Sequence, residues 1–354
     1  MRNLDDIKTI EQFDKSNMRK LLYGFPHQGE AIAGLMGDFK LPSSYKETKN
    51  IMVSGLGGSS VGGDLLKNFL RDKINLPLMV NRSYTLPKWV GKDTLFICVS
   101  YSGNTEETLS TYQIAKQAKS KIIVISSGGE LTELAKKDGF PCIPVPEVGI
   151  PPRTALGYLF FPQLFVIKML GFADIKDSEL SEAIQTLKKL REEIGIDSPK
   201  NKNISKKLAE EIYQTIPLVY TTSDYMEGVG IRWKTQINEN SKSPVYCEFF
   251  SELNHNETMG WEGAEELTGK FSVILLRDKG ESQRMVKRIN ITSSLIKEKT
   301  KKILEVYSKG EGLLSRMLSL IYIGDYVSFY LAVLNDVDPT EIKSILSLKK
   351  SLSN

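Results

Sequence analysis

The sequence predicts an α/β protein with two doubly wound parallel sheets of flavodoxin-like type. Short apolar runs without polar alternation indicate strands buried on both faces, as in parallel sheets. They alternate with stretches of helical period, which is typical of β-α-β units. We expect a helical lead-in, an N-terminal sheet domain, a helical connector, and a C-terminal sheet domain ending in a helix; these parts span 1–46, 47–172, 173–206 and 207–354.

In the N-terminal half, apolar runs predict strands that are each followed by a loop, and helices are predicted after the first and third of them. The expected strands are 50–54, 77–81, 94–99 and 121–125. Helices are expected at 12–22 and 28–36 in the lead-in, at 64–71 after the first strand, and at 105–119 after the third. Four prolines between Pro144 and Pro152 exclude regular structure there. A long apolar helix is expected from there to Leu170.

Small hydroxyl residues follow the apolar run 94–99. Ser100, Ser102 and Thr105 stand around a glycine, and Glu106 and Glu107 then open a helical pattern. The first N–H groups of a helix lack intrahelical partners and lie at its positive end, so they bind anions. An N-cap and a turn would explain one such residue, but three hydroxyls at this spacing favour a phosphate monoester as ligand.

A second glycine-rich stretch, 55–64, follows the run 50–54. Its glycines let the backbone approach a ligand, and Ser59 and Ser60 stand where a helix begins. The pattern is similar to a dinucleotide-binding fingerprint, but the acidic residue expected about twenty residues on is missing. A nucleotide-binding dehydrogenase is therefore the weakest interpretation.

The C-terminal half repeats the architecture without a clear sequence repeat. Strands are expected at 216–220, 244–248 and 271–276, with a helix at 228–239. The loop 221–225 lacks the glycine and serine density of its N-terminal counterpart. We therefore expect one half to keep the phosphate site and the other to contribute side chains to it.

Composition narrows the classes of function. The formal net charge of +4 is too small to indicate a nucleic-acid partner, and the basic run 297–302 is expected to be the solvated face of a helix. Three scattered cysteines (Cys98, Cys142 and Cys247) indicate a reducing compartment. With two histidines and no metal-ligand spacing, we expect no metal and no cofactor.

The start of the chain has no apolar signal core, and the apolar stretch 158–172 is too short to span a bilayer. We therefore expect a cytoplasmic protein without a membrane partner.

Three motifs together point to a family: Gly57-Gly58-Ser59-Ser60, the loop 100–105 (Ser-Tyr-Ser-Gly-Asn-Thr), and 151–158 (Pro-Pro-Arg-Thr-Ala-Leu-Gly-Tyr). The chain resembles the sugar-isomerase (SIS) domain proteins. The segments 151–158 and 236–240 make it most similar to the bifunctional phosphoglucose/phosphomannose isomerases. The resemblance implies two SIS domains, a homodimer, and metal-free interconversion of glucose 6-phosphate and mannose 6-phosphate with fructose 6-phosphate through a cis-enediolate.

The resemblance also implies roles for single residues. Glu239 matches the family's proton-transfer base, His255 its ring-opening residue, Arg153 its enediolate stabiliser, and Lys349 its C-terminal active-site lysine, with Lys350 one residue away in register. The phosphate ligands of the family match Ser59, Ser100, Ser102 and Thr105, beside the backbone of Gly58. Whether His255 acts in its own subunit or across the dimer stays open.

Each of these residues also has an ordinary structural explanation. Glu239 stands near the end of a helix, where the dipole destabilises a carboxylate and makes it more basic. The pattern alone favours a solvated surface glutamate, and the resemblance to the family reverses that preference. His255 lies in a polar loop, where reactive groups and surface residues both occur. Arg153 suits a planar oxyanion, or serves as an ion-pair partner.

The C-terminal helix carries an apolar stripe: Ile342, Ile345, Leu346 and Leu352, with Lys349 among them. A snorkelling lysine would also explain this position of Lys349.

Two further functions compete with the isomerase. A non-catalytic SIS protein that senses sugar phosphates would keep the serine loop but would not need Glu239, His255 and Arg153 together. A glutamine-dependent sugar-phosphate aminotransferase would need an N-terminal domain with a cysteine nucleophile, which this sequence lacks.

Overall fold

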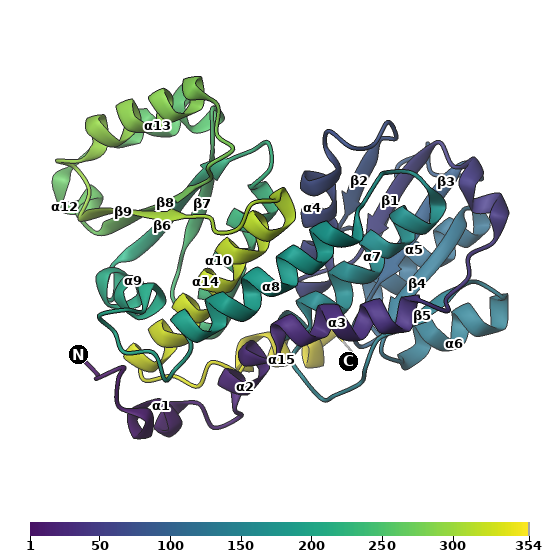
Figure 1. Cartoon of the computed structure of the whole chain (residues 1–354), viewed down its shortest axis with the longest axis horizontal. Coiled ribbons are helices and arrows are strands. Elements are labelled where there is room, and N and C mark those ends of the chain that lie inside the picture. Colours follow the sequence, from purple (N-terminus) through teal and green to yellow (C-terminus); the bar gives the residue numbers. More distant parts are fainter. Residues whose placement is uncertain (353–354) are drawn as a thin grey trace.

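A computed structural model describes residues 1–352 and shows two parallel sheets, each with flanking helices, joined through a layer of long helices (Figure 1). This confirms the predicted doubly wound α/β fold. Every strand pair in both sheets is parallel.

The N-terminal sheet has the strand order β2-β1-β3-β4-β5, which is the flavodoxin-like order. Its strands are β1 (Asn50–Ser54), β2 (Leu78–Asn81), β3 (Thr94–Val99), β4 (Lys121–Ser126) and β5 (Cys142–Pro144). The helices that connect and cover them are α4 (Gly58–Leu70), α5 (Glu106–Gln117), α6 (Gly129–Asp138) and α7 (Leu156–Leu170). All six residues of β3 are buried, which explains its unbroken apolar sequence.

The C-terminal sheet has the order β7-β6-β8-β9, the same topology without a fifth strand. Its strands are β6 (Ile216–Thr222), β7 (Tyr246–Phe250), β8 (Phe271–Arg277) and β9 (Lys302–Tyr307). The helical elements are α10 (Glu227–Ser241), η3 (Glu252–His255), α11 (Glu257–Gly260), α12 (Glu265–Thr268) and α13 (Gln283–Ile296).

The remaining helices lie between the two sheets or along the border of this helical layer. They are α1 (Ile7–Phe13), α2 (Met18–Tyr23), α3 (Phe25–Met36), α8 (Asp177–Ile194), α9 (Ile204–Ile212), α14 (Leu313–Leu334) and α15 (Lys343–Leu352), with the short turns η1 (Ser43–Glu47) and η2 (Pro152–Thr154). The expected connector is thus helical, with its break between α8 and α9, but the boundary expected at 206/207 falls inside α9.

Helix α14 is the centre of the core and packs against α8, α9 and α10. Among the described residues it is the one helix long and apolar enough to cross a membrane, and its apolar window is entirely buried inside the protein. It belongs, with α13 and β9, to the stretch 277–339, where the sequence pattern predicts only a helix face at 297–302. A helix that is apolar all round shows no amphipathic period, which is why it escapes such a pattern.

Three local expectations were wrong. The helix expected at 12–22 is interrupted at 14–17: α1 ends at Phe13, and α2 begins at Met18, whose N–H donates to Asp14 Oδ1 at 2.6 Å. Helix α4 begins at Gly58 rather than Asp64, because Gly57 adopts a φ of 53° that turns the chain into the helix. Ser59 and Ser60 therefore lie in its first turn. The basic run 297–302 is not a helix face: it forms the turn after α13 and the first residue of β9.

The carboxyl edges of the two sheets face opposite ends of the molecule. Helix α4 starts at the carboxyl edge of the N-terminal sheet and runs back along it. Near its end, Lys67 Nζ lies 2.7 Å from Glu227 Oε2, and Asn68 Oδ1 accepts from the N–H of Gly228 at 2.8 Å. Both partners begin α10, directly after the carboxyl edge of the C-terminal sheet. The far end of α10 therefore returns to the carboxyl edge of the N-terminal sheet.

Candidate active site

The two loops expected to bind phosphate meet at the topological switch point of the N-terminal sheet. There β1 and β3 are neighbours whose crossovers lead to opposite sides, and this is where doubly wound sheets bind ligands. The N–H of Tyr101 donates to Ser59 Oγ at 3.3 Å. Ser100 Oγ and Thr105 Oγ1 lie 3.0 Å apart. The hydroxyls of three predicted phosphate ligands are thus gathered at one point.

Gly103 gives this loop its shape. Its φ is 68°, and a Cβ at this position would lie 1.8 Å from the carbonyl oxygen of Gly128, so no other residue fits. The N–H of Gly103 donates to Ser100 Oγ at 3.1 Å, and the N–H of Asn104 donates to Ser102 Oγ at 3.3 Å. Ser102 is exposed at the tip, whereas Ser100 is buried. A phosphate seated here would meet one exposed and one recessed hydroxyl.

Arg153 lies beside the phosphate loops because η2 packs onto the start of α4. A Cβ added to Gly58 would lie 2.9 Å from the Pro152 carbonyl oxygen and 3.1 Å from Arg153 Cα, so this approach requires glycine. The Arg153 side chain is buried. The first turn of α4 and the guanidinium group therefore belong to one site.

The Arg153 guanidinium joins the N-terminal sheet to the end of α10. Its Nη1 lies 3.4 Å from Glu239 Oε2, and its Nε donates to Asn240 Oδ1 at 2.7 Å. Its Nη2 donates to the carbonyl oxygens of Pro339 at 2.7 Å and Thr340 at 3.0 Å. Burial lowers the pKa of Arg153, and the Glu239 carboxylate opposes that shift. The predicted base and the predicted cation thus form an ion pair.

Buried polar residues that sequence reasoning missed hold this arginine in place. Arg232 donates to the Arg153 carbonyl oxygen at 2.6 Å and forms a two-bond ion pair with Asp325 of α14, at 3.0 and 2.8 Å. Asn240 donates to Ser328 Oγ, also on α14, at 2.9 Å. The partners are far apart in sequence, so no local pattern reveals them.

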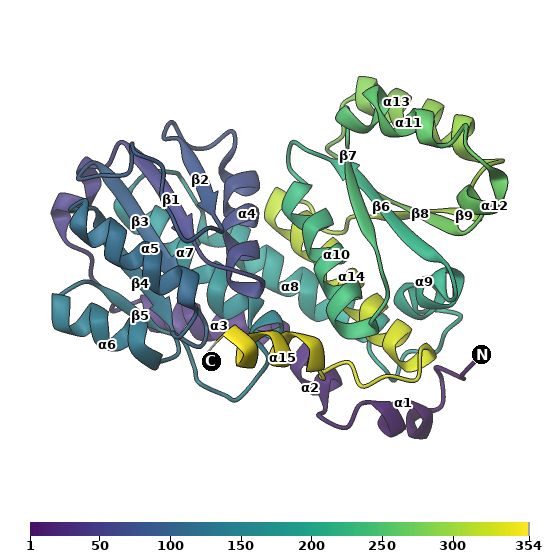
Figure 2. The ribbon, with the colours of Figure 1, turned by 180° about the vertical axis from the view of Figure 1, so that it is seen from behind.

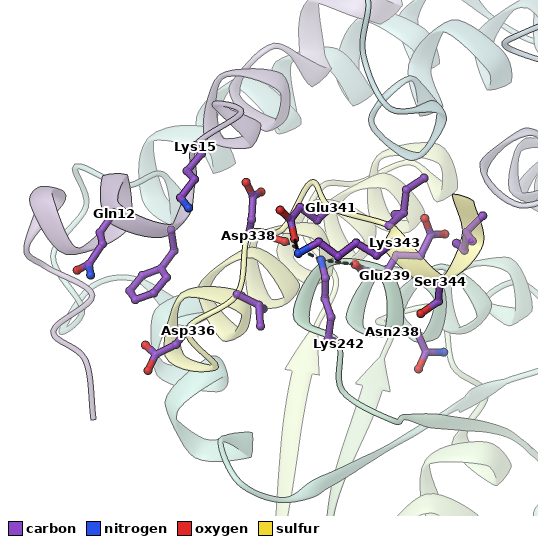
Figure 3. Close-up of a pocket in the computed structure, with 14 residues that line it drawn as sticks. Gln12, Lys15, Asn238, Glu239, Lys242, Asp336, Asp338, Glu341, Lys343 and Ser344 are labelled. Carbon is purple, nitrogen blue, oxygen red and sulfur yellow. Dashed lines mark hydrogen bonds and ion pairs between the residues drawn. The ribbon is translucent and has the colours of Figure 1, made fainter. Parts of the chain in front are cut away.

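A cavity of about 890 Å³ is lined in part by Glu239. Figure 3 shows its lining from the end of α10, α1, and the segment after α14, with Lys242 pointing toward Asp338. Lys242 Nζ donates to the carbonyl oxygens of Glu239 at 2.9 Å, Asn240 at 3.1 Å and Asp338 at 2.6 Å. Of the residues predicted for the site, Glu239 is the one that lines this cavity.

His255 lies away from this group. It ends η3, shortly after the last residue of β7, and is exposed. This places it at the carboxyl edge of the C-terminal sheet, where α10 begins, whereas Glu239 is near the end of α10. At 1.5 Å per residue, the helix alone separates the two levels by about 18 Å. Figure 2 shows α11, the element after His255, beside α13 and at the opposite end of this half from α15.

Lys349 lies on α15, a helix without a buried residue. Its apolar side chains are open to solvent, with Leu346 57% and Leu352 66% exposed. The expected apolar stripe therefore exists: Ile342 and Ile345 line the cavity, while Leu346 and Leu352 are exposed. The structure thus brings Ser59, Ser100, Thr105, Gly58, Arg153 and Glu239 together, with Ser102 at the rim, and leaves His255 apart. Within residues 1–352 no group of three His, Cys, Asp or Glu side chains is arranged to hold a metal ion.

Comparison with known proteins adds independent findings. A family model described as the bacterial phospho-glucose isomerase C-terminal SIS domain matches residues 201–352. A bifunctional phosphoglucose/phosphomannose isomerase of Caldicellulosiruptor bescii is 43% identical over 95% of this chain and 99% of the relative. One of Aquifex aeolicus is 38% identical over 91% of this chain and 97% of the relative. The solved structure of a glucose-6-phosphate isomerase like protein from Thermus thermophilus shares the fold, with a TM-score of 0.64 at 19% identity over 97% of this chain and 99% of that one.

Proposed function

Because the chain belongs to the family of bifunctional phosphoglucose/phosphomannose isomerases, we propose that it interconverts glucose 6-phosphate and mannose 6-phosphate with fructose 6-phosphate. The observation that carries the proposal is the meeting of three features at one sheet edge: the hydroxyl loops, the buried Arg153, and the Glu239 carboxylate paired with it. The hydroxyl loops would bind the phosphate group of the substrate. The Arg153–Glu239 pair would act on the sugar carbons that exchange a proton.

We assign the phosphate to Ser59, Ser100, Ser102 and Thr105, beside the backbone of Gly58. Hydroxyl donors at the start of α4 and α5 would hold the dianion, and the positive ends of both helices point toward it. Anchoring one end of the open-chain sugar fixes where its first two carbons lie. Proton transfer depends on such positioning, because the reacting atoms must be held within hydrogen-bond reach.

We assign proton transfer to Glu239. Its carboxylate takes the proton from C2 of the aldose, and the C–H electron pair forms the double bond of the enediol while the carbonyl oxygen at C1 gains negative charge. Returning the proton to C1 gives the ketose, with a proton passing between the two oxygens. One carboxylate thus serves as base and then as acid, and nothing is oxidised or reduced overall.

We assign stabilisation of the enediolate to Arg153. A guanidinium is permanently charged and planar, so it can bind two adjacent oxygens, and it acts most strongly where water is excluded. Its burial supports the assignment. Lys349 is the second cation proposed for the site, because α15 follows directly on the segment that Arg153 binds.

We propose that His255 opens the sugar ring in the site of a second subunit, within a homodimer. Two observations support this. His255 is exposed near the start of α10, whereas the Glu239 of the same chain lies near the end of that helix. In addition, α15 has exposed apolar side chains that a second copy of the chain would cover. In a twofold dimer the same contact forms twice, so each site gains one histidine.

We also propose a cytoplasmic location. Support comes from the three cysteines, which are all free, since cytoplasmic proteins keep thiols reduced.

The deciding experiment is a coupled assay of fructose 6-phosphate conversion, read separately for glucose 6-phosphate and mannose 6-phosphate. We expect turnover to both. A protein that binds fructose 6-phosphate tightly but converts it to neither product would instead be the sugar-phosphate sensor, which needs the serine loop alone.

A further inference from the structure

Lys242 stands at a position that disfavours a side chain. It ends α10 with a φ of 55°, in the left-handed region where glycine is the usual residue. A lysine at this position strains the backbone, and its side chain makes contacts that a glycine could not make.

The side chain supplies three hydrogen bonds. An ammonium group has three donors, and Lys242 Nζ donates to three carbonyl oxygens, those of Glu239, Asn240 and Asp338. Two of these end α10, where the last carbonyls have no intrahelical partner. The third lies in residues 335–342, the strap that connects α14 to α15.

The strap is bound by a second cation of the site. Arg153 Nη2 donates to the carbonyl oxygens of Pro339 and Thr340, directly after the Asp338 carbonyl that Lys242 binds. The carbonyl oxygens of three successive residues, 338–340, therefore accept hydrogen bonds from Lys242 and Arg153. Arg153 is also paired with Glu239, and Lys242 also binds the end of α10. Figure 3 shows Lys242 between the end of α10 and the strap.

We propose that Lys242 is a positioning residue: its ammonium group fastens the strap to the end of α10, and thereby fixes both the Glu239 carboxylate and the α15 helix that carries Lys349. This rests on the proposed isomerase function for its effect on turnover, but the fastening itself does not.

The fastening depends on the charge of Lys242. Exclusion of water by the surrounding chain, together with the Arg153 cation, lowers the pKa of Lys242 to about 8. Opposing charges come from Asp338 and Glu341 of the strap and Glu239 of α10, and the cavity also contains Lys15 and Lys343. A neutral amine has two donors for three carbonyls, so one bond is lost as the pH rises through about 8.

The test uses Lys242→Gly and a matched control, Lys119→Gly. Lys119 also has a positive φ, 60°, and follows the C-cap residue of α5, Ala118; its side chain makes no hydrogen bond or ion pair within residues 1–352. Both changes relieve the same backbone strain. Only Lys242→Gly should speed amide hydrogen exchange across 338–352 and lower kcat by roughly ten- to a hundredfold, with KM little changed.

The pH dependence gives a second reading. Wild-type kcat should fall above about pH 8, and Lys242→Arg should retain activity there, because a guanidinium stays charged. This variant decides the question if Lys242→Gly fails to fold. Unchanged exchange across 338–352 in Lys242→Gly, or the same alkaline fall in Lys242→Arg, overturns the proposal. A wild-type protein without isomerase activity overturns the proposed function instead, while hydrogen exchange still tests the fastening.

Discussion

At the switch point of the N-terminal sheet, the loops after β1 and β3 carry serine and threonine hydroxyls. At the corresponding point of the C-terminal sheet, the loop after β8 carries carboxylates. Asp278 Oδ1 accepts from Arg316 Nε at 2.8 Å, and Glu281 is paired with Arg277 at 2.9 Å. Backbone donors are occupied as well, since the N–H of Gly280 binds Asp278 and the N–H of Asp278 binds Glu281. The carboxylates of Asp278 and Glu281 would repel a phosphate, and the nearby backbone N–H groups already donate to these carboxylates.

Two halves with the same strand topology therefore carry different side chains at the corresponding edge. The strand orders match, yet one carboxyl edge carries hydroxyl loops and the other carries carboxylates held in ion pairs. The C-terminal half contributes instead through the opposite end of α10, which carries Glu239, Asn240 and Lys242 to the N-terminal edge. The predictions below test this division of labour, in order of decreasing effect.

Removing the carboxylate that the C-terminal half contributes should have the largest effect. Glu239→Gln keeps the shape but cannot accept the C2 proton, and general base catalysis contributes about 10²–10⁴ in rate. We expect kcat to fall by that factor with KM little changed, and exchange of the C2 hydrogen with solvent to stop. Glu341→Gln, which alters a second carboxylate of the same cavity, is the control. Near wild-type exchange in Glu239→Gln would mean that another group is the base.

Removing hydroxyls from the N-terminal loop should weaken substrate binding. A hydrogen bond to a charged group contributes about 1.5–3 kcal/mol, so Ser100→Ala with Ser102→Ala should raise KM for fructose 6-phosphate roughly a hundredfold or more. Ser223→Ala, in the loop after β6, removes a hydroxyl that binds the Phe250 carbonyl and should leave KM unchanged. If Ser223→Ala raised KM as much as the double serine change, the N-terminal loop would have no special role in binding phosphate.

Mixing two inactive subunits should restore activity if His255 serves its partner. A purified heterodimer of Glu239→Gln and His255→Ala chains has one site with both groups intact, so it should show about half of the wild-type kcat. Pairing Glu239→Gln with Arg153→Lys should restore nothing, because those two residues meet within one chain. No recovery in the first heterodimer would assign His255 to its own subunit.

Breaking the ion pairs at the C-terminal switch point should affect stability rather than binding. Asp278→Asn weakens a buried charge-assisted bond to Arg316, and we expect the free energy of unfolding in urea to fall by about 1–3 kcal/mol. The KM for fructose 6-phosphate should not change. A rise in KM comparable to that of the serine variants would show that this edge also contacts the substrate.

Dialysis against EDTA should have no effect on turnover, because the proposed steps use only protein side chains. Loss of activity that zinc or manganese restores would show that a metal takes part and that the assignment of Arg153 needs revision.

The apolar strands and the motif loops could be predicted from sequence, since each depends on neighbouring residues. The run 94–99 and its hydroxyl loop fall where expected, and the switch point follows from the alternation of strands and helices. The partners of Arg153 could not be predicted: Asn240, Arg232 and Pro339 reach it only after three separate segments have packed. Lys242 had no local signal beyond its place at a helix end. The distance of His255 from Glu239 arises because the loop after β7 and the end of α10 lie at opposite ends of that helix, which no periodicity encodes.

Helix α14 has a consequence for how the protein is made. Translation proceeds from the N-terminus, so α8, α9 and α10 leave the ribosome before the helix that covers their apolar faces. Asp325 and Ser328, which hold Arg232 and Asn240 in place, arrive with it. The nascent chain therefore carries an uncovered apolar surface and an unassembled site until residues 313–334 have been synthesised. Exposed apolar surface of this kind makes an incomplete chain prone to aggregation, so the site assembles only once α14 has been synthesised.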